Sequence, residues 1–430
     1  MSVAAVTGVR AQPATNASAP GAVGGERLSL ADAKRIAFEQ NWDLLAAKSG
    51  VDSATAQLIV TKEFPNPTAS ISTAKIGARE AATSLGNGPW ERNYDSIAAV
   101  SQLIEIGGKR RDRQTSARAG IAGARARFFD AKRSLDQGVT KAYVAAALAG
   151  HNAGILNESA GCLRHEAEIA AARFKAGDIS DSDKKQIEIN AEQFELQAKA
   201  AEAAAIQARI TVEVLMGVRQ PKGNWTPAES LDQLVNASPP PAIESTPNAG
   251  RPDVLAAEAD LRRANADLQL QKAVRIPDPT FLVEAEHNPP GGGPAVDTFG
   301  IGVSFPLPLW NRNRGNIKAA EATKDQAAIA LEKVKAQVNS EIANAEAAYR
   351  EAFERWQRYR DQTGPKAAKV RESVAFAYEK GGASLIELLE AERTANDVRL
   401  ATAQAMSDTA NAAADLIAAR SVLSETELSL

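Results

Sequence analysis

Two stretches in the second half of the chain alternate between apolar residues and small or polar ones. They cover 280–287 and 298–306, and a period of two is typical of a strand with one apolar face. The apolar positions of the later stretch are Phe299, Ile301, Val303 and Phe305. Polar residues at the alternate positions of the two stretches include Glu284, Glu286 and Ser304. Corresponding stretches at 68–76 and 94–104 predict an earlier pair of strands, so each half of the chain supplies one hairpin.

Each hairpin is followed by long tracts in which apolar residues recur at alternating spacings of four and three. A repeat of 3.5 residues is typical of helices that pack in a left-handed supercoil. We therefore predict helices over 109–176, 181–216, 315–380 and 384–420. The predicted seams are rich in alanine and include Ala191, Ala198, Ala205, Val212, Ala391, Ala395 and, in the 109–176 helix, Ala142, Ala145 and Ala149. On this pattern alone, an ordinary antiparallel coiled coil is an equally good interpretation.

Both predicted helical hairpins turn at similar sequences, residues 174–180 and 378–384. A glycine can adopt the left-handed conformation that closes a helix, and the candidates are Gly177 and Gly381. A serine can cap the next helix when an acidic residue follows three positions later. The candidate pairs are Ser180 with Asp183 and Ser384 with Glu387.

The sequence contains an internal repeat, with two copies of one structural unit. Residues 41–62 match 251–272 at a constant offset, and both segments run into a Pro-x-Pro-Thr motif. Proline stops a helix because it lacks an amide donor and clashes with the preceding turn. The predicted divisions are a first repeat at 27–218, a Pro-rich linker at 219–250, a second repeat at 251–420 and a tail at 421–430. Residues 1–26 resemble the end of a signal peptide, and we expect them to be processed or disordered.

Composition narrows the function. The net charge is −3, so the composition does not suggest a nucleic-acid-binding protein. Cys162 is the single cysteine, so one chain has no internal disulfide. No run of 18 apolar residues predicts a transmembrane helix. The histidines have no second His or Cys at metal-ligand spacing, and no catalytic motif is present. The sequence therefore predicts no enzyme, no cofactor and no metal site, which disfavours a soluble helical enzyme.

Four strands are too few to close a barrel in a bilayer. An open edge in lipid leaves backbone groups unpaired at several kcal/mol each, and spanning barrels begin at about eight strands. If these strands cross a membrane, several chains must share one barrel. Lipid would then contact Phe299, Ile301, Val303 and Phe305, and the lumen would be lined by Glu284, Glu286 and Ser304. The alternative is a soluble pair of hairpins packed on helices, with the glutamates in water.

The order of motifs resembles the TolC family of outer-membrane efflux proteins, and within it the CzcC-like heavy-metal efflux branch. The resemblance covers about residues 27–420. It rests on the repeated proline motifs and tip turns, and on Leu28-Ser-Leu-Ala-Asp-Ala33, Ser101-Gln-Leu-Ile-Glu-Ile-Gly-Gly-Lys-Arg110, Arg251-Pro-Asp253 and Phe305-Pro-Leu-Pro-Leu-Trp-Asn311. It implies a mainly α fold with a small β part, a TolC-like tube. Three chains would share a twelve-strand barrel in the cell outer membrane, continued by a helical tunnel in the periplasm.

The same resemblance implies partners and sites. The protein would be a passive homotrimeric duct that meets a periplasmic adaptor and an RND-type inner-membrane pump. The resemblance to the CzcC-like branch suggests heavy-metal cations as cargo, and drugs, dyes or organic anions are the alternatives. The adaptor-binding tips would include Gly177, Asp178, Ser180, Gly381, Gly382 and Ser384. Asp178, Asp181 and Asp183 would stand at the tunnel entrance, although the helix dipole alone also favours acids at a helix start. The alternative function is a periplasmic coiled-coil adaptor or scaffold protein of an export system.

Overall fold

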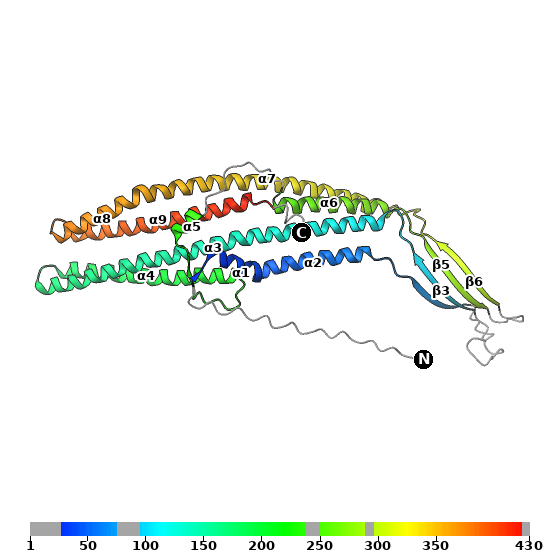
Figure 1. The fold of residues 1–430 in the computed structure, drawn as a ribbon, viewed down its shortest axis with the longest axis horizontal. Coiled ribbons are helices and arrows are strands. Elements are labelled where there is room, and N and C mark those ends of the chain that lie inside the picture. The colour runs from blue at the N-terminus through cyan, green and yellow to red at the C-terminus, as the bar shows by residue number, and fades with distance from the viewer. Residues whose placement is uncertain (1–26, 75–94, 238–249, 289–295, 424–430) are drawn as a thin grey trace, which may run out of the picture.

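The computed structural model describes residues 27–74, 95–237, 250–288 and 296–423, and every structural statement below concerns these ranges. A long body of helices carries a small sheet at one end, inclined to the helices (Figure 1). The helices are α1 (Leu30–Gln40), α2 (Trp42–Lys62), α3 (Lys109–Ala176), α4 (Asp181–Leu215), α5 (Leu231–Ala237), α6 (Pro252–Ala273), α7 (Arg314–Arg358), α8 (Gly364–Glu379) and α9 (Leu385–Arg420). The strands are β1 (Arg27–Leu28), β2 (Thr68–Ala74), β3 (Asp95–Leu103), β4 (Thr226–Pro227), β5 (Thr280–Asn288) and β6 (Val296–Ser304). Most of the predicted tail and all of residues 1–26 lie outside the described ranges.

The strands β2, β3, β5 and β6 form one antiparallel sheet in that order. Each of the strands β2 and β5 follows a proline motif that ends the preceding helix. The strand predicted at 298–306 lies two residues earlier, because Pro306 has no amide group to donate to the ladder. The two edge strands, β2 and β6, each have one side without a partner strand in the described part of the chain.

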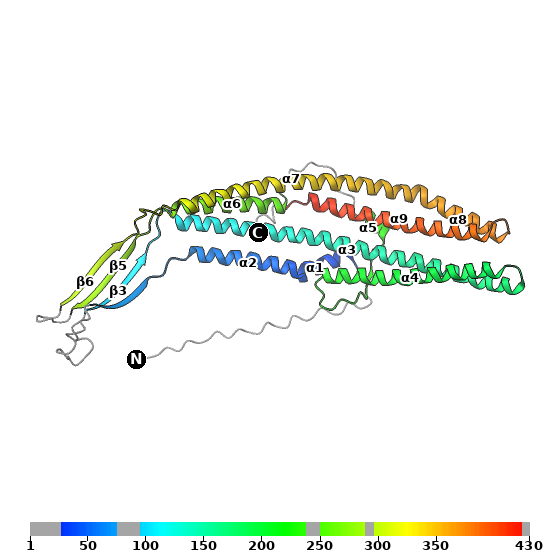
Figure 2. The same cartoon turned by 180° about the vertical axis from the view of Figure 1, so that it is seen from behind.

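The helix α3 runs through the centre of the helical body. Near the sheet it lies between α2 and α6, and α7 packs on α6 (Figures 1 and 2). Toward the far end, α4 and α9 flank α3, and α8 packs on α9. None of the described helices is long and apolar enough to cross a membrane.

The larger of the two hydrophobic clusters in the described chain includes the segment before α5, which packs on α3. Trp225 is fully buried there and stacks on Tyr143 with 5.8 Å between the ring centroids. The Tyr143 hydroxyl lies 2.7 Å from the carbonyl oxygen of Leu28 and also contacts the Glu229 carboxylate, and these contacts hold β1 against α3. The prediction of a linker over 219–250 was therefore wrong for its first part, which folds into β4 and α5 and buries Leu231 and Leu234.

The alanine seam of the returning helices is buried. In α4 the buried side chains at seven-residue intervals are Ala191, Ala198, Ala205 and Val212. The seam prediction was wrong in α3 at Ala145, which is exposed, whereas Val144, Ala146 and Ala147 are buried. This part of α3 is also covered by α1, α5 and β4, so its buried arc is not the coiled-coil seam.

The helix predicted over 315–380 is interrupted. A π-helical turn at Tyr359–Thr363 separates α7 from α8. Pro365 is the physical cause, because its missing amide and its ring both oppose an ordinary helical bond to the carbonyl four residues earlier. Gly364 permits the wider turn, since a Cβ there would lie 3.0 Å from the carbonyl oxygen of Tyr359.

Candidate functional site

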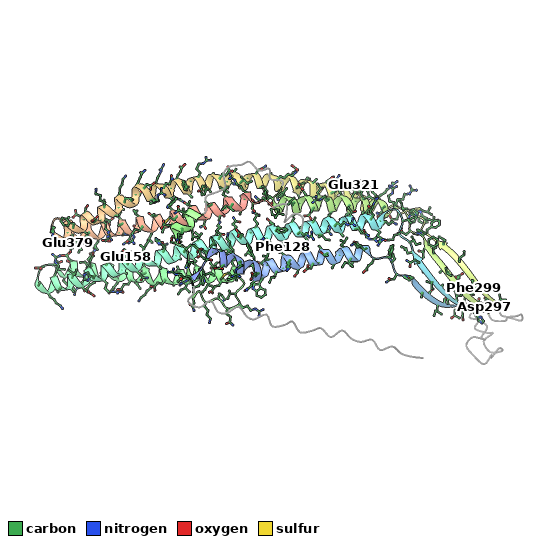
Figure 3. The ribbon with its side chains drawn as sticks, viewed as in Figure 1. Phe128, Glu158, Asp297, Phe299, Glu321 and Glu379 are labelled. Atoms are coloured by element: carbon green, nitrogen blue, oxygen red, sulfur yellow. The ribbon has the colours of Figure 1, made fainter. Side chains whose placement is uncertain are left out.

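One face of the sheet is an exposed apolar surface. Strand pairing places Val303 beside Phe281, Ile301 beside Val283 and Phe299 beside Ala285, all on one side. On this side Ile301 is 90% exposed, Ile71 of the edge strand β2 is 88% exposed and Phe299 is 84% exposed. Figure 3 shows Phe299 on the sheet, at the opposite end of the molecule from Glu379 near the tip of the helices. Such exposure of large apolar residues marks a surface that contacts lipid or another chain.

The opposite side of the sheet carries mostly small and polar residues, together with the apolar residues Ile97, Leu103 and Leu282. Glu284, Glu286 and Ser304 all lie on it, at the alternate positions of β5 and β6. The Glu284 side chain lies across Gly300, where a Cβ would come within 2.7 Å of a carboxylate oxygen. Phe305 lies just beyond the end of β6 and is exposed. The structure thus separates the two predicted sets of strand residues onto opposite faces.

The exposed apolar surface of the sheet is bounded by a polar pair of residues at the end far from the helices. His287 and Asp297 face each other across β5 and β6, with 2.6 Å between the His287 Nδ1 and Asp297 Oδ1 atoms. They belong to the same face as Phe299 and lie two residues further from the helices. The apolar part of this face therefore extends from the pair Val303 and Phe281 to the pair Phe299 and Ala285. The next pair on the same face, His287 and Asp297, is polar.

The two tips at the far end of the body are built alike. Gly177 has φ +85° and Gly381 has φ +75°, the left-handed conformation expected of both. In each tip the residue after the glycine donates back into the last turn: Asp178 to the Arg173 carbonyl at 3.0 Å and Gly382 to the Ala377 carbonyl at 2.8 Å. These bonds span five residues. In addition, the Gly177 amide donates to the Phe174 carbonyl and the Gly381 amide donates to the Tyr378 carbonyl, each three residues back, so both helices are closed in the same way.

The predicted capping serines both act as caps. The Ser384 hydroxyl accepts from the Glu387 amide at 3.3 Å, and the Glu387 carboxylate accepts from the Ser384 amide at 2.7 Å, a complete capping box. The Glu387 pKa is held below its ordinary value, first by that amide and then by the hydroxyl. The Ser180 hydroxyl accepts from the Asp183 amide at 3.1 Å.

The predicted entrance acids have local contacts. Asp181 forms an ion pair with Lys185 one turn later, at 2.7 Å, which lowers the Asp181 pKa. The Asp183 carboxylate accepts from the Ser180 hydroxyl at 2.7 Å. The six predicted tip residues lie in two turns, one between α3 and α4 and one between α8 and α9. Both turns lie at the end of the helical body that is opposite the sheet (Figure 1).

Polar contacts between α3 and α9 link the two helical hairpins between the tips and the middle of the body, and no sequence pattern predicts them. Ser159 donates to Asn396 at 2.7 Å and both side chains are buried. Arg399 bonds to Glu158 at 2.6 Å and lowers its pKa. Burial, and then the neighbouring Glu392, raise the pKa of Glu166. Such partners lie on different helices, so only the fold brings them together.

The described residues contain no group of three or more His, Cys, Asp or Glu side chains placed to hold a metal ion. The candidate functional features of the described residues are therefore surfaces: the apolar face of the sheet, the polar face of the sheet and the two helical tips. A family model described as outer membrane efflux protein matches residues 35–218 and 247–420. The chain belongs to this family. The first matched segment lies within the first repeat, and the second covers the whole second repeat and begins four residues before it.

The protein is an outer-membrane efflux channel subunit of the kind that works in tripartite systems, with its helical part in the periplasm. Its family consists of passive channels and is not an enzyme family. This membership confirms the predicted TolC-like fold and decides against the adaptor or scaffold alternative.

Three comparisons show the extent of the similarity. The cobalt-zinc-cadmium resistance protein CzcC of Cupriavidus metallidurans is 24% identical over 376 residues, which is 87% of this chain and 85% of CzcC. The CmeC outer membrane channel of Campylobacter jejuni has 20% identity and a TM-score of 0.75, over 91% of this chain and 85% of CmeC. The MtrE outer membrane channel of Neisseria gonorrhoeae has 21% identity and a TM-score of 0.70, over 94% of this chain and 93% of MtrE. At these identities the solved structures show the fold alone.

Proposed function

We propose that three copies of the chain close one twelve-strand barrel in the outer membrane and continue it as a periplasmic tunnel. The observation that supports this most is the sheet, which has an exposed apolar face and two edge strands without partners in the described chain. Open edges are not stable in lipid, so the edge of one copy has to pair with the edge of another. Closed rotational symmetry gives each copy the same pair of neighbours.

In this trimer the two faces of the sheet have different surroundings. The apolar residues Phe299, Ile301 and Val303 face lipid, and Phe305 lies at the inner boundary of the membrane. The glutamates Glu284 and Glu286, with Ser304, face the lumen. β5 and β6 have 9 residues each, which is about 30 Å of strand and suits an apolar band of about 25 Å crossed at a tilt.

The helical tips are the proposed contact with a periplasmic adaptor, and through it with an inner-membrane pump. Their shared geometry supports this, because two similar turns on each copy offer a ring of near-equivalent surfaces. The surface of each tip consists of the residues around Gly177 and Gly381, namely Asp178, Ser180, Gly382 and Ser384. A repeated partner can dock on such a ring with the same contacts at each turn.

A ring of carboxylates at the entrance is a further part of the proposal. Asp178, Asp181 and Asp183 would gather there in three copies and attract cations. The local contacts of Asp181 and Asp183 are the competing explanation, since both acids also stabilise the start of α4. The variant D181N/D183N separates the two: an unchanged cation preference in single-channel recordings would leave these residues as helix-start acids only.

The proposed cargo is heavy-metal cations. The support is similarity to CzcC, whose name describes cobalt, zinc and cadmium resistance. As a passive duct the protein needs no metal-binding site of its own, since its partners supply the energy. Deletion of the gene should lower tolerance to such metals more than tolerance to drugs or dyes. Lower tolerance to drugs alone would refute this cargo.

The duct itself is tested by mass and conductance. Protein purified in detergent should have the mass of three chains and should form discrete ion-conducting channels in planar lipid bilayers. A matched preparation of the variant I301D/V303D, which places charges on the apolar face, should yield little membrane-inserted trimer. A monomer that stays soluble without detergent and conducts no ions would refute the proposal.

A further inference from the structure

The edge strands β2 and β6 present the surface through which copies meet. If the proposed trimer is right, β6 of each copy pairs with β2 of the next, but the proposal leaves the register of that pairing open. Register decides which side chains touch, and a slip by two residues keeps every side chain on its own face. The register therefore has to come from geometry and not from the apolar pattern.

The boundary between the two repeats inside one chain is a template for this contact. There, β3 of the first repeat pairs with β5 of the second, with Val100 opposite Val283. The ladder continues past the sheet, because the Ile104 amide donates to the Pro279 carbonyl at 3.0 Å. The contact between copies joins the same two parts of the unit, the last strand of one repeat and the first strand of the next.

Equivalent residues follow from the two hairpins. Thr68 lies opposite Ser101 in the first hairpin, and Thr280 lies opposite Ser304 in the second, so these pairs correspond. The sequence agrees with both assignments. Pro-Asn-Pro precedes Thr68 and Pro-Asp-Pro precedes Thr280. An apolar pair also follows each serine at the same spacing, Ile104 and Ile106 in the first repeat, Leu307 and Leu309 in the second.

Transferring the internal boundary onto these equivalent residues fixes the register. Val100 corresponds to Val303, and Val283 corresponds to Ile71. We propose that β6 pairs with β2 of the adjoining copy so that Val303 lies opposite Ile71 of the partner subunit. Across the apolar face this joins two β-branched side chains, a pairing that stabilises sheets. It also places the bulky Ile301 opposite a small residue, Thr73 of the partner subunit.

Barrel closure supports the same register. A line across the sheet passes from Thr68 to Ser101, Leu282 and Gly302, and the proposed pairing carries it to Ser72 of the partner subunit. Each copy therefore shifts the line by four residues over four strands. With about 3.3 Å per residue and about 4.8 Å between strands, the strands tilt by about 35°, within the usual range for barrels.

The two neighbouring registers are less favourable. If Ile301 lay opposite Ile71 of the partner subunit, the shift would halve and the tilt would fall to roughly 20°, too low for a barrel of this kind. If Phe305 took that place, the ladder would run across both Pro306 and Pro308, which have no amide donors. The proposed register reaches only Pro306, at its last pair.

Disulfide trapping tests the register in the full-length protein. In a Cys162→Ser background, Ile71→Cys is combined in turn with Val303→Cys, Ile301→Cys or Phe305→Cys. Opposed residues in a sheet have Cα atoms about 4.5–5.5 Å apart, which a disulfide can bridge, whereas diagonal neighbours lie at about 7–8 Å. Copper-phenanthroline in air supplies the oxidant. Non-reducing gels report covalent links between chains, and Ile71→Cys alone gives the background.

We expect the pair at 71 and 303 to give a covalent trimer that reduction dissolves, and the two slipped pairs to stay at background. Mass measurement in detergent on the same samples separates this inference from the proposed function. A trimeric mass with links at 301 or 305, or with no links at any pair, would overturn the register alone. A monomeric mass would overturn the trimer and the register together.

Discussion

Lys109→Met removes a buried charge contact at the place where the two repeats join within one chain. The Lys109 ammonium group donates to Asp278 at 2.7 Å and to the Ile276 carbonyl at 2.5 Å. The Asp278 carboxylate also accepts from the Ile106 amide at 2.9 Å. This network ties the start of α3 to the connection before β5, so its loss should weaken the junction between helices and sheet.

The cost follows from burial. The Lys109 and Asp278 side chains are 7% and 18% exposed, so neither regains much water when its partner is lost. Removing one member of a buried ion pair costs about 3–5 kcal/mol. Asp278 keeps the Ile106 amide and some access to water, so we expect about 2–4 kcal/mol for Lys109→Met. Asp278→Asn should cost about 1–3 kcal/mol, and the double variant should cost less than the two single costs added together.

Urea unfolding in detergent measures these costs, at fixed protein and detergent concentration because an oligomer's stability depends on both. Lys335→Met is the matched control, since its ion pair with Glu332 is exposed and should be worth less than about 0.5 kcal/mol. A cost for Lys109→Met no larger than that of the control would show that the buried contact does not stabilise the junction. Costs of Lys109→Met and Asp278→Asn that simply add in the double variant would show that the two residues do not act as a pair.

Three further outcomes are expected. Trp225→Ala should cost about 3–5 kcal/mol in the same unfolding assay, with Trp225→Phe clearly milder, because the indole is fully buried. Tyr143→Phe should cost about 1–3 kcal/mol and speed proteolytic release of the segment around Leu28, because the hydroxyl contacts with the Leu28 carbonyl and the Glu229 carboxylate are lost, although the Ala228 amide still donates to that carbonyl. The lowered Glu387 pKa stabilises the tip above the ordinary pKa of a glutamate and stops doing so as pH falls through the lowered value. Amide exchange in the first turn of α9, corrected for its intrinsic rate, should therefore accelerate below about pH 4 in the wild type but not in E387Q.

The tips could be predicted from sequence because the forces that form them are local. A glycine in the left-handed conformation ends one helix, and a serine three residues later caps the start of the next. Each turn is therefore determined by two residues, Gly177 with Ser180 and Gly381 with Ser384. The two faces of the sheet follow from a period of two for the same reason. These local rules place Phe299, Ile301 and Val303 on one face and Glu284, Glu286 and Ser304 on the other, as observed, whereas Phe305 lies beyond the end of β6.

Long-range packing explains the errors. Trp225 looked like part of a linker because its partner, Tyr143, lies far away in sequence on α3. Ala145 fitted the seam, but α3 is covered there on more than one side, so periodicity no longer identifies the buried arc. Gly364 and Pro365 can be identified in the sequence as the cause of the π turn. The sequence does not show, however, that the helix continues beyond them with wider hydrogen bonds and does not end there.

In the proposed trimer, the junction within one chain and the junction between copies are alike in strand pairing and different in charge. Within the chain, Asp278 is the acid that holds Lys109. The equivalent residue of the first proline motif is Asn66, which carries no charge, so the same ion pair cannot form where one copy meets the next. Backbone ladders and apolar contacts such as that of Val303 therefore have to stabilise the contact between copies. The energy measured for Lys109 and Asp278 describes how firmly one chain holds its own repeats together, and the boundary between copies should separate first under denaturant.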